Sequence, residues 1–171
     1  PGSAATSGLM RWVLDQNAET LSRDYTAIGE LYVAHHAWFH ELWKAGPPTY
    51  VHGDLHIGNV FLDGDRVGFI DWGLSCTSTH LRDVSYFLTM SVDIEERRAN
   101  ERALLRTYLD ALRSAGGSAI SFDDAWKAHR LHASYTVIAT FLAYMPTYAA
   151  GDGVGLGNAL LARANAAIED L

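Results

Sequence analysis

Hydrophobic and aromatic side chains recur at intervals of three and four residues over residues 19–44, a spacing typical of an amphipathic helix. The members of this face are Leu21, Tyr25, Ile28, Leu31, Tyr32, His35, Trp38, Phe39 and Leu42. The sequence Gly46-Pro47-Pro48 ends the pattern, because glycine and proline disfavour a helix interior. A shorter helix is predicted before it, over residues 9–16.

The pattern changes from helical to extended in the middle of the chain. Residues 49–51 form a short extended run, and two further apolar runs occupy residues 60–62 and 67–70. Asp63-Gly64-Asp65-Arg66 separates these two runs, and Asp-Gly between apolar runs indicates a hairpin. The sequence therefore predicts one small β-hairpin.

Helical periodicity returns after the hairpin. Further helices are predicted over residues 81–92, 94–114 and 121–145, and in a last segment ending near Leu171. Ser121 and Asp124 have the spacing of a capping box, with Asp124 at the position usual for glutamate. The alternating glycines of residues 151–157 follow no strand, which favours a flexible link between helices over a dinucleotide site. The predicted fold is mainly α with a small β-hairpin.

Composition narrows the function further. A length of 171 residues suits a single domain, and the net charge of −7 argues against a nucleic-acid-binding protein. No apolar run reaches the length of a membrane span, and residues 1–7 resemble a tag remnant with a flexible start rather than a signal peptide. Cys76 is the single cysteine, so no internal disulfide can form. We expect a cytoplasmic protein that binds neither nucleic acid nor membrane.

Polar residues cluster at both ends of the predicted hairpin. Asp54 and Asn59 lie in the loop before it, and Asp71 follows its second strand. A hairpin brings its two ends side by side, so these three side chains can converge. An aspartate that accepts a hydroxyl proton, together with an asparagine and a second aspartate that hold Mg²⁺, are the parts that phosphoryl transfer needs. His52 and His56 are predicted to fix the loop through hydrogen bonds.

The spacing of these residues follows that of kinase catalytic loops. His52-Gly53-Asp54 and Asn59 fit the form His-x-Asp followed by four residues and Asn, and Ile70-Asp71-Trp72-Gly73 stands where kinases carry Asp-Phe-Gly. The stretch Tyr50–Leu88 resembles the aminoglycoside phosphotransferase and choline kinase-like family, which phosphorylates small molecules. In that family the two motifs precede a helix that begins Asp-x-x-x-aromatic, as at Asp83.

The resemblance implies a role for each matching residue. Asp54 would be the catalytic base or orienting carboxylate, Asn59 and Asp71 the Mg²⁺ ligands, and Asp83 a brace for the catalytic loop. ATP or GTP would donate the phosphoryl group, and the acceptor would be a small hydroxylated molecule. The family often has proline where this chain has Ile57, which changes the stiffness of the loop rather than its chemistry.

The resemblance covers only the C-terminal lobe of a protein-kinase-like (α+β) fold. No sheet pattern, glycine-rich turn or strand lysine precedes His52. We therefore expect residues 8–171 to be this lobe, with the catalytic loop and metal motif at 50–73 and a helical substrate platform at 81–171. The N-terminal nucleotide lobe would be absent, and this chain alone inactive or weakly active.

Other functions remain open on the sequence alone. The chain could be a non-catalytic binding module that self-associates through an apolar face on residues 9–44, where a second lobe would dock. It could also be a metal-dependent phosphohydrolase, although no later cluster of His and Asp supplies a second metal site. His36 and His40 are one helical turn apart but lack the glutamate of a His-Glu-x-x-His zinc motif, which favours a plain amphipathic helix. Aromatic residues on the 121–145 helix are expected to be mostly core.

Overall fold

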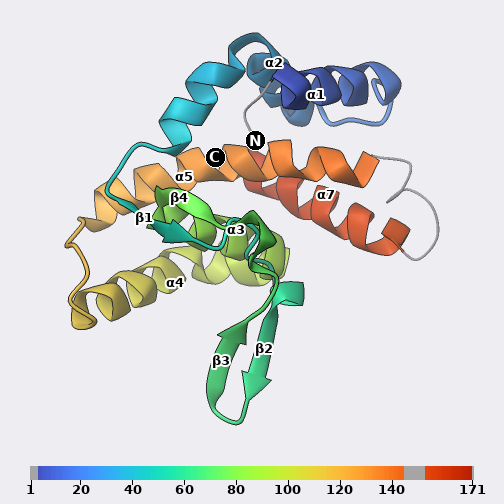
Figure 1. Cartoon of the computed structure of the whole chain (residues 1–171). Helices are drawn as coiled ribbons and strands as arrows, with labels where there is room; N and C mark the ends of the chain where they lie inside the picture. Colours follow the sequence, from blue (N-terminus) through green and yellow to red (C-terminus); the bar gives the residue numbers. More distant parts are fainter. Residues whose placement is uncertain (1–3, 145–152, 171) are drawn as a thin grey trace. The chain divides into compact units, whose positions relative to one another are not determined.

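The computed structural model describes residues 4–144 and 153–170 and is mainly helical (Figure 1). The chain forms two compact units. One unit consists of Pro1–Gly46 and Ala133–Leu171, and the other of Pro47–His132. The boundary falls within helix α5 (Phe122–Ala139), which contributes residues to both units.

The first unit is built from helices alone in its described part. Its elements are α1 (Ala4–Gln16), α2 (Arg23–Trp43), the end of α5, a 3-10 helix η3 (Thr140–Tyr144) and α7 (Gly153–Glu169). Ser22 caps α2 by accepting a hydrogen bond from the N–H of Tyr25 at 3.1 Å. The buried hydroxyl of Tyr25 donates to the carbonyl of Val137 at 3.2 Å, which ties α2 to α5.

The second unit carries all the described strands. Its elements in chain order are β1 (Pro48–Val51), the 3-10 helix η1 (Ile57–Asn59), β2 (Val60–Asp63), β3 (Arg66–Phe69), the 3-10 helix η2 (Trp72–Leu74), β4 (Cys76–Thr79), α3 (His80–Ser91), α4 (Ile94–Ser114) and the start of α5. The hairpin β2–β3 is antiparallel with Val60 opposite Phe69, and its ribbon extends away from α3 in Figure 1. Strands β1 and β4 form a second antiparallel pair, with Val51 opposite Cys76.

The core of the second unit lies between α3, α4 and α5. Its fully buried members are Leu81, Leu105, Leu109 and Ala125. The rings of Tyr108, Phe122 and Trp126 pack against them, and the guanidinium of Arg102 lies 4.2 Å from the centre of the Trp126 ring. This core fixes α3, whose first turn carries Asp83.

Several elements match the sequence-based predictions. The hairpin is confirmed, with Gly64 at a φ of 60° in the first central position of its two-residue turn, as in a type II′ turn. The predicted serine cap of α5 is also confirmed, because the Oγ of Ser121 accepts the N–H of Asp124 at 3.1 Å. The carboxylate of Asp124 accepts the hydroxyl of Ser121 at 2.7 Å, rather than its backbone N–H as in a full capping box.

Other predictions were wrong. Helix α1 begins at Ala4, within the stretch expected to be a flexible start, and Ser7 is buried. Helix α5 changes to a 3-10 helix at Thr140 instead of continuing toward residue 145. Of the alternating glycines, those at 153, 155 and 157 belong to α7 rather than to a flexible link, and Gly151 lies outside the described residues. The pairing of β4 with β1 was not predicted.

No helix in the described part of the chain has both the length and the apolar character that crossing a membrane requires.

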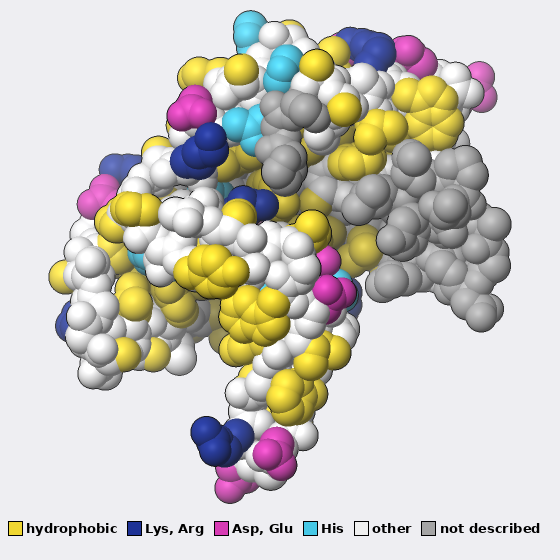
Figure 2. Space-filling model, in the orientation of Figure 1, with side chains coloured by type: hydrophobic (Ala, Val, Ile, Leu, Met, Phe, Trp, Pro, Cys, Tyr) yellow, Lys and Arg dark blue, Asp and Glu magenta, His cyan; other side chains and the backbone are white. Residues whose placement is uncertain are grey.

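Exposed hydrophobic side chains gather on the second unit. They are Tyr50, Ile57, Phe61, Leu62, Val67, Phe69, Ile70, Trp72 and Leu74. Figure 2 shows hydrophobic side chains along the projecting hairpin, with acidic and basic side chains at its tip. In α1 and α2, by contrast, only Trp12, Leu31 and Trp38 among the large hydrophobic residues are exposed, and the others are buried or half-buried. The larger apolar surface therefore lies beside the candidate site, not on residues 9–44.

Candidate active site

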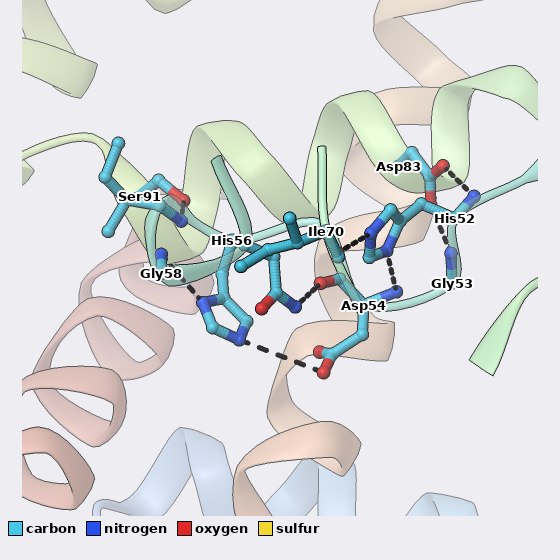
Figure 3. Close-up of polar contacts among 10 residues, drawn as sticks. His52, Gly53, Asp54, His56, Gly58, Ile70, Asp83 and Ser91 are labelled. Carbon is cyan, nitrogen blue, oxygen red and sulfur yellow. Dashed lines mark hydrogen bonds and ion pairs between the residues drawn. The ribbon is translucent and has the colours of Figure 1, made fainter. Parts of the chain in front are cut away.

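The loop between β1 and β2 is held by the carboxylate of Asp83. One oxygen of Asp83 accepts the backbone N–H of His52 at 2.6 Å, and the other accepts that of Gly53 at 3.0 Å (Figure 3). The two backbone groups and the carboxylate are about thirty residues apart in sequence, and the first turn of α3 supplies the carboxylate. The backbone leading into Asp54 is thereby fixed to the core of the unit.

His52 joins the loop to the segment that follows the hairpin. Its Nε2–H donates to the carbonyl of Ile70 at 2.7 Å, which leaves Nδ1 to face the N–H of Asp54 at 3.4 Å. The ring is almost fully buried and lies 4.7 Å from the Trp72 ring, centre to centre. His52 therefore connects the motif that contains Asp54 with the motif that contains Asp71.

Gly53 meets a requirement that no other residue can meet. Its φ is +86°, a left-handed conformation that side chains disfavour, and an added Cβ would clash with the carbonyl oxygen of Leu74. The loop and the η2 turn approach each other so closely here that only a hydrogen atom fits between them.

The amide of Asn59 is oriented by the backbone of Asp54. Its Nδ2 donates to the carbonyl oxygen of Asp54 at 2.9 Å, so its Oδ1 remains as an acceptor. The backbone carbonyl of Asn59 in turn accepts the N–H of Ile70 at 3.0 Å. The hairpin ends therefore meet at Asn59 and Ile70, and Asp71 is the next residue along the chain.

Asp71 has a strained backbone. Its φ and ψ are 59° and 60°, and it is the one residue other than glycine with positive φ in the described part of the chain. A left-handed conformation costs about 1–2 kcal/mol for a residue with a side chain, although aspartate and asparagine tolerate it better than most. The strain places an exposed carboxylate at the turn into η2.

His56 and Ser91 complete the loop. The N–H of Gly58 donates to Nδ1 of His56 at 3.1 Å, and Nε2 of His56 lies 3.8 Å from Oδ2 of Asp54 (Figure 3). The Oγ of Ser91 accepts the N–H of Ile57 at 2.8 Å. Sequence reasoning missed Ser91, because a serine at the end of a helix carries no motif that would link it to a loop more than thirty residues earlier.

The donor atoms at the hairpin base suit a hard divalent cation. They are the free Oδ1 of Asn59 and the carboxylate of Asp71, and Mg²⁺ prefers oxygen ligands from one or two side chains together with phosphate oxygens. Within residues 4–144 and 153–170 there is no group of three His, Cys, Asp or Glu side chains arranged to hold a metal. A cation at this site would therefore need ligands from a bound phosphate or water.

An apolar pocket of about 440 Å³ borders the loop. Leu55, Val60 and Phe69 line it on the hairpin side, and these residues adjoin Asp54, Asn59 and Ile70 in the chain. Helices α3 and α4 supply the other wall. The pocket therefore adjoins the site through apolar side chains of the loop and of the hairpin.

Two histidines outside the loop, His40 and His129, have structural partners. Nε2 of His40 lies 3.0 Å from the hydroxyl of Tyr32. His129 is buried between the Oγ of Ser85 at 2.9 Å and the carboxylate of Glu101 at 3.0 Å. Burial alone would raise the pKa of Glu101, but hydrogen bonds from His129 and Arg97 bring that pKa below its ordinary value.

Comparison with known protein families found one family whose profile matches this chain. Residues 3–119 match the sequence profile of the phosphotransferase enzyme family (APH), and this range includes the whole loop, the hairpin and α3. No curated protein and no solved structure was found to match the chain.

Proposed function

Because this chain belongs to the phosphotransferase enzyme family, we propose that it moves the γ-phosphoryl group of ATP to a hydroxyl of a small molecule with the help of Mg²⁺. One observation carries the proposal. The backbone before Asp54 is anchored by Asp83, and the base of the same hairpin holds Asn59 and the strained Asp71. These contacts support a base at Asp54 and two metal-binding oxygens at Asn59 and Asp71, all at the base of one hairpin.

Each residue has a separate task in this reaction. The carboxylate of Asp54 accepts the proton of the acceptor hydroxyl as its oxygen attacks phosphorus. Asn59 and Asp71 would hold Mg²⁺, which would neutralise charge on the phosphate oxygens. Catalysis then rests on positioning and electrostatics rather than on a covalent intermediate. His52, Asp83 and Ser91 act by fixing the backbone.

We also propose that this chain is the catalytic C-terminal lobe of a protein-kinase-like fold. Its helical content, the hairpin between the two motifs and the family match support this assignment. The isolated chain would then be inactive or weakly active. GTP is proposed as an alternative donor, because it carries the same triphosphate and the same γ-phosphoryl group as ATP.

A second candidate is a non-catalytic binding module. The exposed hydrophobic side chains on the hairpin and in η2 favour association with another protein surface or with a second copy of the chain, because burying them releases ordered water. Dimerisation that is lost when Leu62, which is 74% exposed, is replaced by Ser would support this candidate.

The test uses the complete gene product that contains these 171 residues. It is incubated with γ-labelled ATP, Mg²⁺ and a pool of hydroxylated metabolites and aminoglycosides, beside its Asp54→Asn variant. Label that moves into one compound only when Asp54 is present would establish the transfer and identify the acceptor. Equal transfer by the Asp54→Asn variant would overturn the assignment. The 171-residue chain, tested in parallel, measures how much activity this lobe has alone.

A further inference from the structure

His56 has a ring whose two nitrogens are chemically distinct. Its Nδ1 accepts the N–H of Gly58 at 3.1 Å, and a nitrogen that accepts a hydrogen bond carries a lone pair instead of a proton. The proton of the neutral ring is therefore on Nε2. The ring also packs over Gly58, where an added Cβ would lie 2.9 Å from Cε1 of His56. Both contacts fix the direction in which the Nε2–H points.

That direction is toward Asp54. Nε2 lies 3.8 Å from Oδ2 of Asp54, which is too long for a direct hydrogen bond, and the two groups face one another in Figure 3. A single oxygen atom at about 2.8 Å from each of them would complete a triangle. The side chains of His56 and Asp54 are 34% and 30% exposed, so an oxygen from solution can reach the space between them.

We propose that Asp54 and His56 together clamp the acceptor hydroxyl, an inference that rests on the proposed function. The hydroxyl donates its hydrogen to Oδ2 of Asp54 and accepts the Nε2–H of His56 through one lone pair. Its second lone pair then has a fixed direction and forms the bond to the γ-phosphorus. The bond from phosphorus to the β–γ bridging oxygen breaks, the hydroxyl proton passes to Asp54, and His56 keeps its own proton throughout.

This clamp restricts the chemistry of the reacting group. A hydroxyl can donate and accept hydrogen bonds at once, whereas a protonated amine has no lone pair to accept the Nε2–H. An ammonium at this position would leave the Nε2–H without an acceptor. The site therefore selects an alcohol as acceptor, even in a molecule that also carries amino groups.

The local structure offers a variant that separates the two roles of His56. Asparagine caps helix N-termini well, so His56→Asn keeps an acceptor for the N–H of Gly58. Its side chain is too short to reach toward Asp54. His56→Gln has a longer side chain that can restore a donor there. His35→Asn, at an exposed histidine of α2, is the matched control.

The experiment measures initial rates with the complete gene product, MgATP and water as the acceptor, by release of labelled phosphate. We expect His56→Asn to lower kcat about tenfold, the effect of one hydrogen bond, with the KM for ATP and the melting temperature unchanged. His56→Gln should recover part of kcat, and His35→Asn should match the wild type.

The outcomes separate this inference from the proposed function. Suppose that the wild-type protein releases phosphate and the Asp54→Asn variant does not. If the His56→Asn variant then has the same kcat as the wild type, the clamp is refuted and the proposed function stands. The clamp is also refuted if a lower melting temperature accounts for the loss of kcat in His56→Asn and if His56→Gln recovers no kcat. If neither phosphate release nor transfer to a compound of the acceptor pool depends on Asp54, the proposed function fails and the clamp fails with it.

Discussion

The carboxylate of Asp83 accepts a hydrogen bond of 2.6 Å from the backbone N–H of His52, and this contact fixes the candidate catalytic loop to the first turn of α3. A loop is otherwise the part of a fold with the fewest constraints. The position of the loop is therefore set by a residue that takes no part in the proposed reaction.

Replacing Asp83 by Ala should destabilise the protein by about 3 kcal/mol, because two backbone N–H groups lose a charged acceptor. Phosphoryl transfer should also fall, since the loop is released. Asp110→Ala is the control, because that exposed carboxylate on α4 only pairs with Arg113 at 3.1 Å. Urea unfolding of both variants measures the difference, and equal stabilities would contradict the anchoring role.

Gly53→Ala should lower the free energy of unfolding by more than backbone strain alone explains. Gly53 and Gly116 have similar φ angles of +86° and +80°, but an added Cβ at Gly116 meets nothing within 4 Å. We expect Gly116→Ala to cost about 1–2 kcal/mol from the left-handed conformation. The Gly53→Ala variant should cost at least twice as much, because Leu74 must also move. Thermal unfolding of the pair would show no such difference if the close approach were unimportant.

Asp71→Asn should separate charge from backbone geometry. Asparagine also tolerates the left-handed conformation, so the φ of 59° can be retained. The loss of the carboxylate should remove the Mg²⁺-dependent part of ATP binding. A titration with a fluorescent ATP analogue, with Mg²⁺ and with EDTA, measures this part. Binding that stays fully Mg²⁺-dependent in Asp71→Asn would exclude Asp71 as a metal ligand.

The free energy of unfolding should fall as the pH drops from about 6.5 to 4. Burial, and secondarily the positive charge of Arg82, lowers the pKa of His132 from 6.5 to about 4. Between these values the unfolded chain binds more protons than the folded one, so stability from this group is full above pH 6.5 and is lost on acidification. The shift corresponds to about 3 kcal/mol.

His132→Leu should remove this component, while the exposed His35→Gln should leave it in place. Denaturant unfolding at several pH values between 4 and 7.5 tests both variants. His80, whose pKa burial also lowers, contributes in the same direction and remains in the two variants. A wild-type profile that is flat over this range would contradict the buried, neutral state of these histidines.

Local signals in the sequence predicted the parts of the fold that local interactions determine. The hairpin follows from Gly64 between two apolar runs, and the start of α5 follows from the hydrogen bond between Ser121 and Asp124. The pairing of β1 with β4 could not be predicted in this way. These strands have four residues each and little alternation in burial, and long-range contacts rather than propensity bring them together.

In the candidate site, too, the sequence predicts some features and long-range contacts determine the others. The spacing of Asp54, Asn59 and Asp71 is visible in the sequence, but the contacts that hold them are not. The hydrogen bond from Ile57 to Ser91 and the one from His52 to the carbonyl of Ile70 involve backbone groups, which every residue has. The interpretation of the glycines at 153, 155 and 157 as a flexible link also failed, because these glycines belong to α7.

Residues can be added at the tip of the hairpin without changing the geometry of the site at its base. Its base is fixed by the pairing of Val60 with Phe69, while at its tip a side chain added at Gly64 would meet nothing within 4 Å. Exposed turns of this kind are where proteins accept insertions. A fluorophore or short epitope placed between Gly64 and Asp65 would leave Asn59 and Asp71 in register. The turn is therefore a natural position for a reporter of hairpin motion.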